Sequence, residues 1–352
     1  MNKIIKLGRK EIGQGSPVYI IAEAGVNHNG NPESACELAR QANQTGADCV
    51  KFQTFRAEEI VTKNAPKAAY QLKVTDPKES QFQMLKKLEL QVVDYEKIVE
   101  TCKEKDIQFL STPYNFKDAE FLNELGVDGF KIASGQIVEL PFLKYTANFG
   151  KPMIVSTGMA TLGEVEEAIR TIRAAGNDQI VLLQCTTNYP SVVQDANIRA
   201  MVTMGNALDV LVGYSDHTQN NYSVYAAVAL GACVIEKHFT LDRNLPGPDH
   251  SCSLDREEFS QMVNGVRDVE RALGSAVKSP TISESKNIIG MRRSIVANRL
   301  IPAGTAISQE AVGFKRPATG MEPRFLNQLL GKKARRDISA DRPIVFDDIN
   351  WE

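Results

Sequence analysis

The chain has 352 residues, a formal net charge of -2, 43% hydrophobic residues and 24% charged residues. This balance is typical of a water-soluble globular protein, and it excludes a strongly basic nucleic-acid-binding protein and a disordered acidic tail. The length favours two domains. Apolar runs such as residues 224–230 are too short to span a bilayer, and charge returns too soon after residue 1 for a signal-peptide core. We therefore expect a cytoplasmic protein with no nucleic-acid or membrane partner.

The cysteine pattern agrees with that compartment. The six cysteines are scattered without close pairs, and four of them fall within apolar or helical patterns. A disulfide framework would need a recognisable pairing, so we expect reduced thiols. Cys185 and Cys252 lie nearest to the candidate site, but neither has a neighbouring residue that marks it as a nucleophile.

Eight short apolar segments alternate with amphipathic stretches along most of the chain. Asn31 as an N-cap, Pro32 at the first helical position and Gly46 near the end predict one helix, and residues 163–174 and 254–273 have the same helical spacing. Strands apolar on both faces and separated by helices indicate a parallel sheet covered by helices. Eight such units fit a (β/α)8 TIM barrel better than an open doubly wound sheet. The predicted strands are residues 18–22, 49–53, 108–112, 129–133, 153–157, 180–185, 210–214 and 233–238.

Three further segments complete the predicted organisation. The polar segment between residues 55 and 92 is long enough to form a lid or a substrate loop over the barrel mouth. The barrel domain is expected to cover residues 1–275, and the polar residues 276–290 predict a linker. Residues 291–352 predict a small second domain, which needs a docking surface to gain much stability.

All four histidines come just after predicted strands, where a TIM barrel collects its functional residues. His217 and His238 end neighbouring strands, so their side chains can converge on one divalent cation. A pair of imidazoles leaves coordination positions for water and substrate, as a Lewis-acid site requires. His28 and His250 receive no role from this pattern.

Glu23 ends the first predicted strand, which is adjacent to the eighth strand in a closed barrel. From there its carboxylate could contact a metal-bound water or act as a general acid or base. The alternative is a structural salt bridge to Lys51 or Lys237.

Two lysines, Lys51 and Lys131, interrupt apolar strands, so each is expected to point into the barrel or its mouth. A buried lysine without an anionic partner is costly. Together with hydroxyl side chains on the same rim, the lysines predict a site for a small anion that carries phosphate or carboxylate. The competing role is a Schiff-base nucleophile, as in class I aldolases of this fold. The hydroxyl residues are Ser111, Thr112, Ser134, Ser156, Thr157, Thr186, Thr187 and Ser215.

Nine segments, in the right order, resemble motifs of the sialic acid synthase family, and the tail from Met291 resembles that family's antifreeze-like SAF domain. The likeness runs through the whole predicted barrel. The set is specific, whereas any one motif alone would be weak. The segments are residues 20–30, 50–55, 109–113, 130–135, 155–159, 185–190, 213–217, 235–240 and 247–250.

The resemblance implies condensation of phosphoenolpyruvate with an N-acetylmannosamine-type sugar, which gives a nine-carbon 2-keto acid and phosphate. It also implies a divalent cation, Mn2+ or Mg2+, on His217 and His238, where it would polarise the sugar aldehyde. Glu23, Lys51 and Lys131 complete the implied catalytic set. The implied substrate-binding residues are Gln53, Thr112, Ser134, Thr187, Tyr189, Ser215, Asp249 and Arg316.

Arg316 lies in the second domain and matches a residue that reaches the sugar's acetamido group in the partner's active site. A domain-swapped homodimer is therefore expected, and docking of the small domain would stabilise it.

The identity of the sugar is left open by these motifs. N-acetylneuraminate synthase is the first interpretation, and N,N'-diacetyllegionaminate synthase, acting on 2,4-diacetamido-2,4,6-trideoxymannose, is the alternative. Pseudaminate synthesis and a sugar 6-phosphate substrate fit the sequence less well.

Two other classes of protein fit the sequence less well. A metal-dependent hydrolase of this fold commonly carries His-x-His on its first strand, whereas residues 27–29 read Asn-His-Asn. A carbohydrate-binding protein with an inert barrel would not need the full predicted catalytic set.

Overall fold

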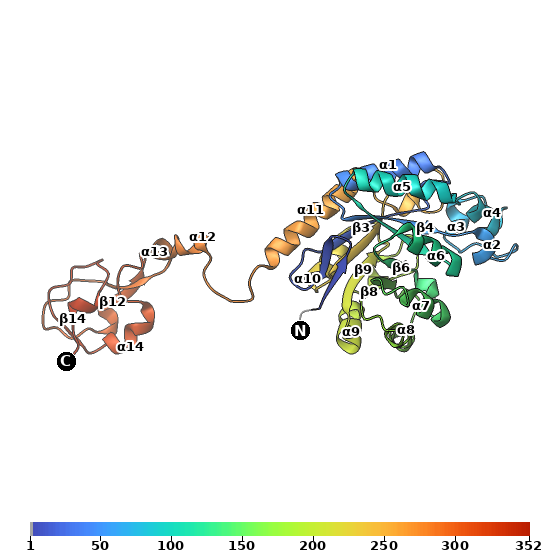
Figure 1. The fold of residues 1–352 in the computed structure, drawn as a ribbon. Helices are drawn as coiled ribbons and strands as arrows, with labels where there is room; N and C mark the ends of the chain where they lie inside the picture. Colours follow the sequence, from blue (N-terminus) through green and yellow to red (C-terminus); the bar gives the residue numbers. More distant parts are fainter. Residues whose placement is uncertain (1–2) are drawn as a thin grey trace. The chain divides into compact units, whose positions relative to one another are not determined.

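The computed structural model describes residues 3–352 (Figure 1). The chain forms two compact units, one ending at Gly274 and the other beginning at Ser275. The segment predicted as a linker, residues 276–290, carries the short helix α12 (Ile282–Ser285) and most of α13 (Ile288–Met291).

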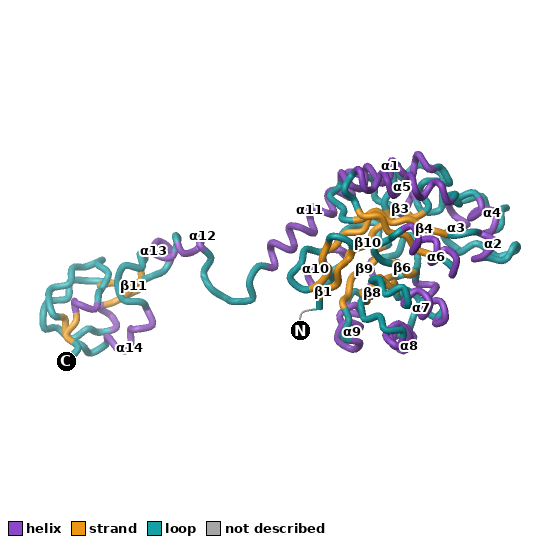
Figure 2. Tube along the Cα trace, viewed as in Figure 1, coloured by secondary structure: helices purple, strands orange, loops and turns teal. Residues whose placement is uncertain are grey.

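The first unit contains an eight-stranded parallel sheet in the order β5-β4-β3-β10-β9-β8-β7-β6, surrounded by helices (Figure 2). The first barrel strand pairs with the last, and the two end strands β5 and β6 lie next to each other, so the sheet closes. The predicted TIM barrel is confirmed, because an open doubly wound sheet would not bring β3 beside β10. The strands are β3 (Tyr19–Gly25), β4 (Cys49–Thr54), β5 (Gln108–Pro113), β6 (Phe130–Ile132), β7 (Met153–Ser156), β8 (Ile180–Cys185), β9 (Leu211–Asp216) and β10 (Val234–His238).

Several helices around the barrel begin at residues whose side chains accept from the free N–H groups of the first turn. Asn31 accepts a hydrogen bond from the N–H of Glu33, as its predicted N-cap role requires. The last barrel helix begins two residues later than predicted, because Asp255 caps it in a capping box with Glu258. No helix within residues 3–352 is long and apolar enough to cross a membrane. The helices are α1 (Pro32–Gln44), α5 (Val92–Glu104), α6 (Phe116–Leu125), α7 (Leu140–Ala147), α8 (Leu162–Ala174), α9 (Arg199–Leu208), α10 (Tyr222–Ala229) and α11 (Arg256–Leu273).

An antiparallel hairpin of β1 (Ile4–Leu7) and β2 (Lys10–Gly13) precedes the barrel, and the sequence analysis did not predict it. Its buried side chains Ile5, Leu7 and Ile12 pack against apolar residues that fill the N-terminal end of the barrel. Each fully buried Leu or Ile contributes about 1.5–3 kcal/mol of transfer free energy. The hairpin therefore closes this end of the barrel with an apolar core, whose barrel members include Tyr19, Ile21, Cys49, Leu110, Ile154, Val181, Leu183 and Val234.

The segment between β4 and α5, residues 55–91, contains three short helices rather than a structureless loop. They are α2 (Ala57–Ile60), α3 (Gln71–Val74) and α4 (Gln81–Lys86). The buried Lys67 ammonium holds the segment together, because it donates to the Thr75 hydroxyl at 2.8 Å and pairs with the Glu79 carboxylate at 2.9 Å. We call residues 55–91 the β4–α5 segment.

The second unit has its own apolar core, formed around small antiparallel strand pairs. The fully buried Asp348 carboxylate pairs with Arg336 at 2.7 Å and Arg342 at 2.9 Å, which satisfies its charge. The elements are β11 (Ser294–Ala297), β12 (Val312–Lys315), α14 (Leu326–Leu329), β13 (Lys333–Ala334) and β14 (Ile349–Asn350).

Candidate active site

A cavity of about 310 Å³ opens at the C-terminal ends of the barrel strands. All but two of the predicted site residues line it, which brings together side chains that are far apart in the sequence. Thr187 is not among the lining residues, and Arg316 belongs to the second unit. The predicted residues in the lining are Glu23, Lys51, Gln53, Thr112, Lys131, Ser134, Tyr189, Ser215, His217, His238 and Asp249.

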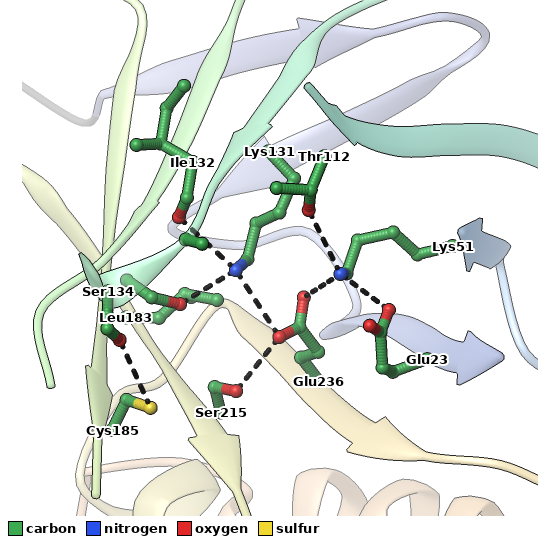
Figure 3. Close-up of polar contacts among 12 residues, drawn as sticks. Glu23, Lys51, Thr112, Lys131, Ile132, Ser134, Leu183, Cys185, Ser215 and Glu236 are labelled. Atoms are coloured by element: carbon green, nitrogen blue, oxygen red, sulfur yellow. Dashed lines mark hydrogen bonds and ion pairs between the residues drawn. The ribbon is translucent and has the colours of Figure 1, made fainter. Parts of the chain in front are cut away.

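The floor of the cavity is a buried network of ion pairs (Figure 3). Lys51 Nζ lies 2.5 Å from a Glu23 carboxylate oxygen and 3.8 Å from Glu236 Oε2. Lys131 Nζ lies 3.4 Å from Glu236 Oε1, which also accepts a hydrogen bond from the Ser215 hydroxyl at 2.9 Å. Both lysines are only 3% exposed. Glu236 therefore joins the two ammonium groups into one network.

The charges in this network support one another. Burial alone would lower the pKa of Lys51, but Glu23 and Glu236 raise it above its ordinary value. Burial would raise the pKa of Glu236, but Lys131 and Lys51 lower it to about 2. The pKa of Lys131 is lowered, because burial outweighs the nearby Glu236. For Glu23, burial raises the pKa although Lys51 opposes the shift. Glu236 is thus ionised and Lys51 is protonated at neutral pH.

Glu236 is the member of the floor that the sequence analysis missed. Successive side chains of a strand point to opposite faces, so Glu236 shares the inward face with His238, which was predicted. Lys237, between them, faces away and pairs with Asp216. Counting back two residues from His238 would have found it. Lys51 is the partner of Glu23 because the parallel register of β3 and β4 aligns these two residues.

Hydroxyl groups lie beside both ammonium groups. Lys51 Nζ donates to Thr112 Oγ1 at 3.3 Å, and Lys131 Nζ donates to Ser156 Oγ at 2.8 Å. The Ser134 hydroxyl accepts a hydrogen bond from the N–H of Gly158 at 3.0 Å, an approach that a side chain at position 158 would block. Ammonium and hydroxyl groups converging on one cavity suit the binding of an oxyanion.

Thr187 lies beside this floor but outside the cavity lining. Its Oγ1 is buried and finds no hydrogen-bond partner in the described part of the chain, and a side chain at Gly158 would collide with it. Its role in substrate binding stays a prediction.

His217 and His238 meet at one side of the cavity, with ring centroids 5.4 Å apart. His217 Nδ1 donates to the carbonyl oxygen of Thr186 at 2.7 Å, which leaves a lone pair on Nε2. His238 Nδ1 is buried, and no residue among 3–352 forms a hydrogen bond with it. Both imidazoles therefore have an uncommitted nitrogen, as metal-ligating histidines require.

The surroundings of the His238 ring agree with such a role. Burial lowers the pKa of His238 well below its ordinary value, and His217 adds to the shift, so the His238 ring is neutral at pH 7. The described residues contain no group of three or more His, Cys, Asp or Glu that could hold a metal ion. A cation held here would have two protein ligands and would leave its other positions to water and substrate. The residues fit the predicted divalent cation in this way.

Two further predicted residues, Tyr189 and Asp249, lie close to the imidazoles. The Tyr189 ring is 4.1 Å from the His217 ring, measured between centroids. An Asp249 carboxylate oxygen lies 3.9 Å from His238 Nδ1. Burial raises the pKa of Asp249 to about 7, and the charge of Glu23 adds to the shift. Both side chains can contact a ligand held between the floor and the imidazoles.

The β4–α5 segment forms a different kind of wall across the cavity. It contributes mainly apolar side chains, with Tyr70, Gln71 and Gln81 between them. The Tyr70 ring packs 4.9 Å from the Tyr189 ring, which joins this wall to the barrel side. The cavity is therefore charged on the barrel side and largely apolar on the β4–α5 side. The apolar residues of this wall are Phe55, Ile60, Val61, Met84, Leu85 and Leu88.

The contacts of Arg316 are known only within the second unit. Its Nε donates to the carbonyl oxygen of Met291 at 3.1 Å. Its role in the active site of a partner subunit stays a prediction.

A closed (β/α)8 barrel with paired lysines and imidazoles at the C-terminal ends of its strands has the architecture of a barrel enzyme. The model of the NeuB family matches residues 38–278, and the model of the SAF domain matches residues 292–350. The chain therefore belongs to the NeuB family. The predicted family, the predicted SAF domain and the prediction of an enzyme are confirmed.

Named relatives make the likeness more specific. N,N'-diacetyllegionaminic acid synthases of Campylobacter jejuni and Legionella pneumophila are 45% and 42% identical to this chain. The alignments cover 92% and 97% of this chain and 98% and 97% of the relatives. The crystal structure of an N-acetylneuraminic acid synthetase from Leptospira borgpetersenii has a TM-score of 0.73 and 32% identity, covering 82% of this chain and 96% of its own.

Proposed function

We propose that the protein condenses phosphoenolpyruvate with an N-acetylated mannose-type sugar, forming a carbon–carbon bond and releasing phosphate. The observation that carries this proposal is the joined network of Lys51, Glu236 and Lys131 in one cavity with the imidazoles of His217 and His238. Family membership supports the same reaction class.

Phosphoenolpyruvate carries a phosphate and a carboxylate, and it needs fixed positive charge in a dry site. Lys51 and Lys131 supply that charge, and the hydroxyls of Thr112, Ser134 and Ser215 supply uncharged donors around it. Glu236 keeps the two ammonium groups in place. The lowered pKa of Lys131 indicates that Glu236 alone does not fully stabilise the charged ammonium group. A bound anion would add negative charge beside Lys131.

The rival role of these lysines, a Schiff-base nucleophile, fits the site poorly. Such a lysine attacks as the neutral amine, which requires a pKa lowered toward 7. The pKa of Lys51 is raised, and the lowered pKa of Lys131 is opposed by the Glu236 carboxylate 3.4 Å away. Both side chains are better suited to anion binding.

His217 and His238 would hold the divalent cation, which when bound supplies a Lewis acid for the aldehyde oxygen of the sugar. C3 of phosphoenolpyruvate attacks the aldehyde carbon, whose oxygen takes up a proton to become a hydroxyl, and water adds to C2 with loss of a proton. Breaking the C2–O bond then releases phosphate and leaves the 2-keto acid. Glu23, whose pKa burial raises, is placed to take the proton from this water. Tyr189 and Asp249 orient the sugar hydroxyls.

The sugar that we place first is 2,4-diacetamido-2,4,6-trideoxymannose. The relatives named for N,N'-diacetyllegionaminic acid are more similar to this chain, at 45% and 42%, than the N-acetylneuraminic acid synthetase at 32%. The apolar side chains of the β4–α5 segment suit a 6-methyl group and a second acetyl group better than two hydroxyls. N-acetylmannosamine, which the sequence analysis placed first, is the second candidate, because Asp249 and Tyr189 provide polar contacts for hydroxyls.

The test is phosphate release from phosphoenolpyruvate with a panel of sugars, followed by the mass of each product. The panel contains 2,4-diacetamido-2,4,6-trideoxymannose, N-acetylmannosamine and N-acetylmannosamine 6-phosphate. We expect the highest kcat/KM with the first and the lowest with the phosphorylated sugar. Preference for N-acetylmannosamine would overturn the choice of sugar alone, whereas no phosphate release with any sugar would overturn the reaction.

The predicted domain-swapped homodimer has a test of its own. Lys131→Met and Arg316→Ala should each be almost inactive, the second mainly through weak use of the sugar. If Arg316 acts in the partner's cavity, subunit exchange between the two variants creates one intact site per mixed dimer. Activity should then recover, and a mixture as inactive as its components would contradict the swap.

A further inference from the structure

Two buried histidines near the cavity have no part in the proposed reaction. His28 lies in the loop between β3 and α1, and His250 lies in the loop between β10 and α11. Each is 1% exposed, and the Nε2 atom of each is buried without a hydrogen-bond partner among the described residues. An unpaired buried polar atom costs free energy, so two of them in adjoining loops require an explanation.

The contacts of His28 define which of its nitrogens carries the proton. The backbone N–H of Gly30 donates to His28 Nδ1 at 3.0 Å, so Nδ1 holds a lone pair. Burial lowers the pKa of His28 to about 4, and the charge of His250 adds to the shift. The ring is therefore neutral, and its hydrogen is on Nε2. His28 Nε2 is a donor without an acceptor.

His250 has the opposite arrangement. Its Nδ1 lies 2.7 Å from Thr240 Oγ1. The Thr240 hydroxyl is also placed to donate to the carbonyl oxygen of Asp242 at 3.2 Å, and with that bond made its oxygen accepts from Nδ1–H of His250. The Nε2 atom of His250 then holds a lone pair. It is an acceptor without a donor.

The two loops are held against each other around these rings. Asn29 Nδ2 donates to the carbonyl oxygen of Pro246 at 2.9 Å, and Asn27 Nδ2 donates to Ser253 Oγ at 2.9 Å. Gly247 is enclosed between the loops, since a Cβ atom there would lie 2.9 Å from Asn29 Oδ1 and 3.1 Å from the Nε2 atom of residue 250. The Nε2 atom of His250 therefore lies beside the turn at Gly247, which contacts Asn29 of the first loop.

We propose that one buried water joins the two rings, accepting from Nε2–H of His28 and donating to Nε2 of His250, and that this bridge positions the turn carrying Asp249. The carboxylate of Asp249 lines the cavity, and its backbone oxygen accepts from Ser253 Oγ at 2.6 Å. His28 and His250 are positioning residues, because they act on the substrate through Asp249. The link to the sugar rests on the proposed function, whereas the imidazole pair does not.

A metal ion shared by the two rings is a different arrangement, and the contacts oppose it. Metal ligation at His28 Nε2 would require that nitrogen to lose its proton. The neutral ring would then carry the proton on Nδ1, where the N–H of Gly30 already donates. Only His250 presents a lone pair, so a hydrogen bond is the arrangement that satisfies both rings.

The direct test is NMR of the wild-type protein labelled with 15N-histidine, which is tractable because the chain has four histidines. We expect His28 to be protonated on Nε2 alone and His250 on Nδ1 alone, with both rings neutral at pH 7. His28→Phe and His250→Phe assign the signals. The same tautomer in both rings, or two protonated nitrogens in either, would overturn the proposal.

The functional test compares the two single variants with the double variant. His28→Phe leaves an unpaired lone pair on His250, so KM for the sugar should rise by about tenfold while KM for phosphoenolpyruvate stays within about twofold. His28→Gln, which keeps a donor near Nε2, should recover most of the loss. The double variant should be no worse than the poorer single variant, because neither partner is then left unpaired.

Multiplied effects in the double variant, or an equal rise in KM for phosphoenolpyruvate, would contradict the positioning role. Thermal unfolding of each variant shows whether it is folded. If the wild-type protein turns over no sugar, the proposed function fails, and the NMR experiment still decides on the imidazole pair.

Discussion

The two ends of the barrel interior contrast sharply, although the same strands build both. At the N-terminal end the inward side chains are apolar and pack on the hairpin, whereas two residues further along the same strands they are charged or polar and line the cavity. Stability is therefore concentrated at one end and chemistry at the other. The contrast is visible in the pairs Ile21 and Glu23, Cys49 and Lys51, Leu110 and Thr112, and Val234 and Glu236.

Removal of divalent cations should have the largest effect, and it should act on the cavity end alone. Exhaustive chelation is expected to abolish phosphate release, and added Mn2+ should restore it. Without the cation, the side chains of His217 and His238 cannot act as a Lewis acid for the aldehyde oxygen. The unfolding midpoint in denaturant should change little, since the apolar end holds no metal ligand. Full turnover after complete metal removal would refute the Lewis-acid role.

Lys131→Met should lower kcat/KM for phosphoenolpyruvate by about 100- to 1000-fold, because it removes one charge from the anion site and leaves Glu236 less neutralised. Steady-state kinetics at saturating sugar give the value. Lys144→Met, an exposed lysine on α7, is the matched control and should be neutral. Similar kinetics in both variants would remove Lys131 from the site.

Leu7→Ala tests the apolar end. Leu7 is 1% exposed in the hairpin core, so truncation should lower the free energy of unfolding by about 2–5 kcal/mol while kcat stays close to wild type. Ile4, on the same strand but 52% exposed, is the control, and Ile4→Ala should cost less than about 0.5 kcal/mol. A large loss of kcat without a loss of stability in Leu7→Ala would contradict the division between the two ends.

The smallest effect should be the pH dependence of stability that Asp249 adds to the metal-free protein. Burial raises its pKa from 3.8 to about 7, so the folded state holds the proton more tightly than the unfolded state. Stability is therefore lost as the pH rises from about 4 to 7, and above that range the loss is complete. Asp249→Asn should be more stable than wild type by about 1–3 kcal/mol at pH 8 and equal to it at pH 3.

Urea unfolding at several pH values measures this difference. Asp195→Asn, at an exposed position, should keep the wild-type pH dependence. An Asp249→Asn variant that is less stable than wild type at pH 8 would show that the carboxylate is stabilised in the folded protein.

The sequence predicted the barrel and most of the cavity for a physical reason. Lys51 and Lys131 stand out because they interrupt apolar strands, and His217 and His238 stand out because each closes one. Such contrasts are visible without knowing which strands are neighbours. Because of these contrasts, the sequence predicts the residues at the cavity end of the barrel better than those at its N-terminal end.

What the sequence could not give depends on register or on distant packing. Glu236, Lys237 and His238 form one polar run at the end of β10. Only the alternation of side chains along the strand shows that Glu236 and His238 point into the barrel and that Lys237 does not. The hairpin was missed because its strands are four residues long and are stabilised by the barrel core rather than by their own pattern. The placement of His28 and His250 in adjoining loops depends on contacts across more than 200 residues, as the hydrogen bond from Asn27 to Ser253 illustrates.

The position of Glu236 on the last barrel strand has a consequence for folding. Lys51 meets Glu23 as soon as β3 and β4 pair, but the carboxylate that faces Lys131 arrives only with β10. A barrel without its final strand would hold an uncompensated ammonium in its interior, which opposes the accumulation of half-built forms. Closure of the sheet by β10 therefore also brings in the carboxylate that neutralises Lys131. Lys131, which we place in the anion site, would therefore destabilise a barrel that lacks the strand carrying Glu236.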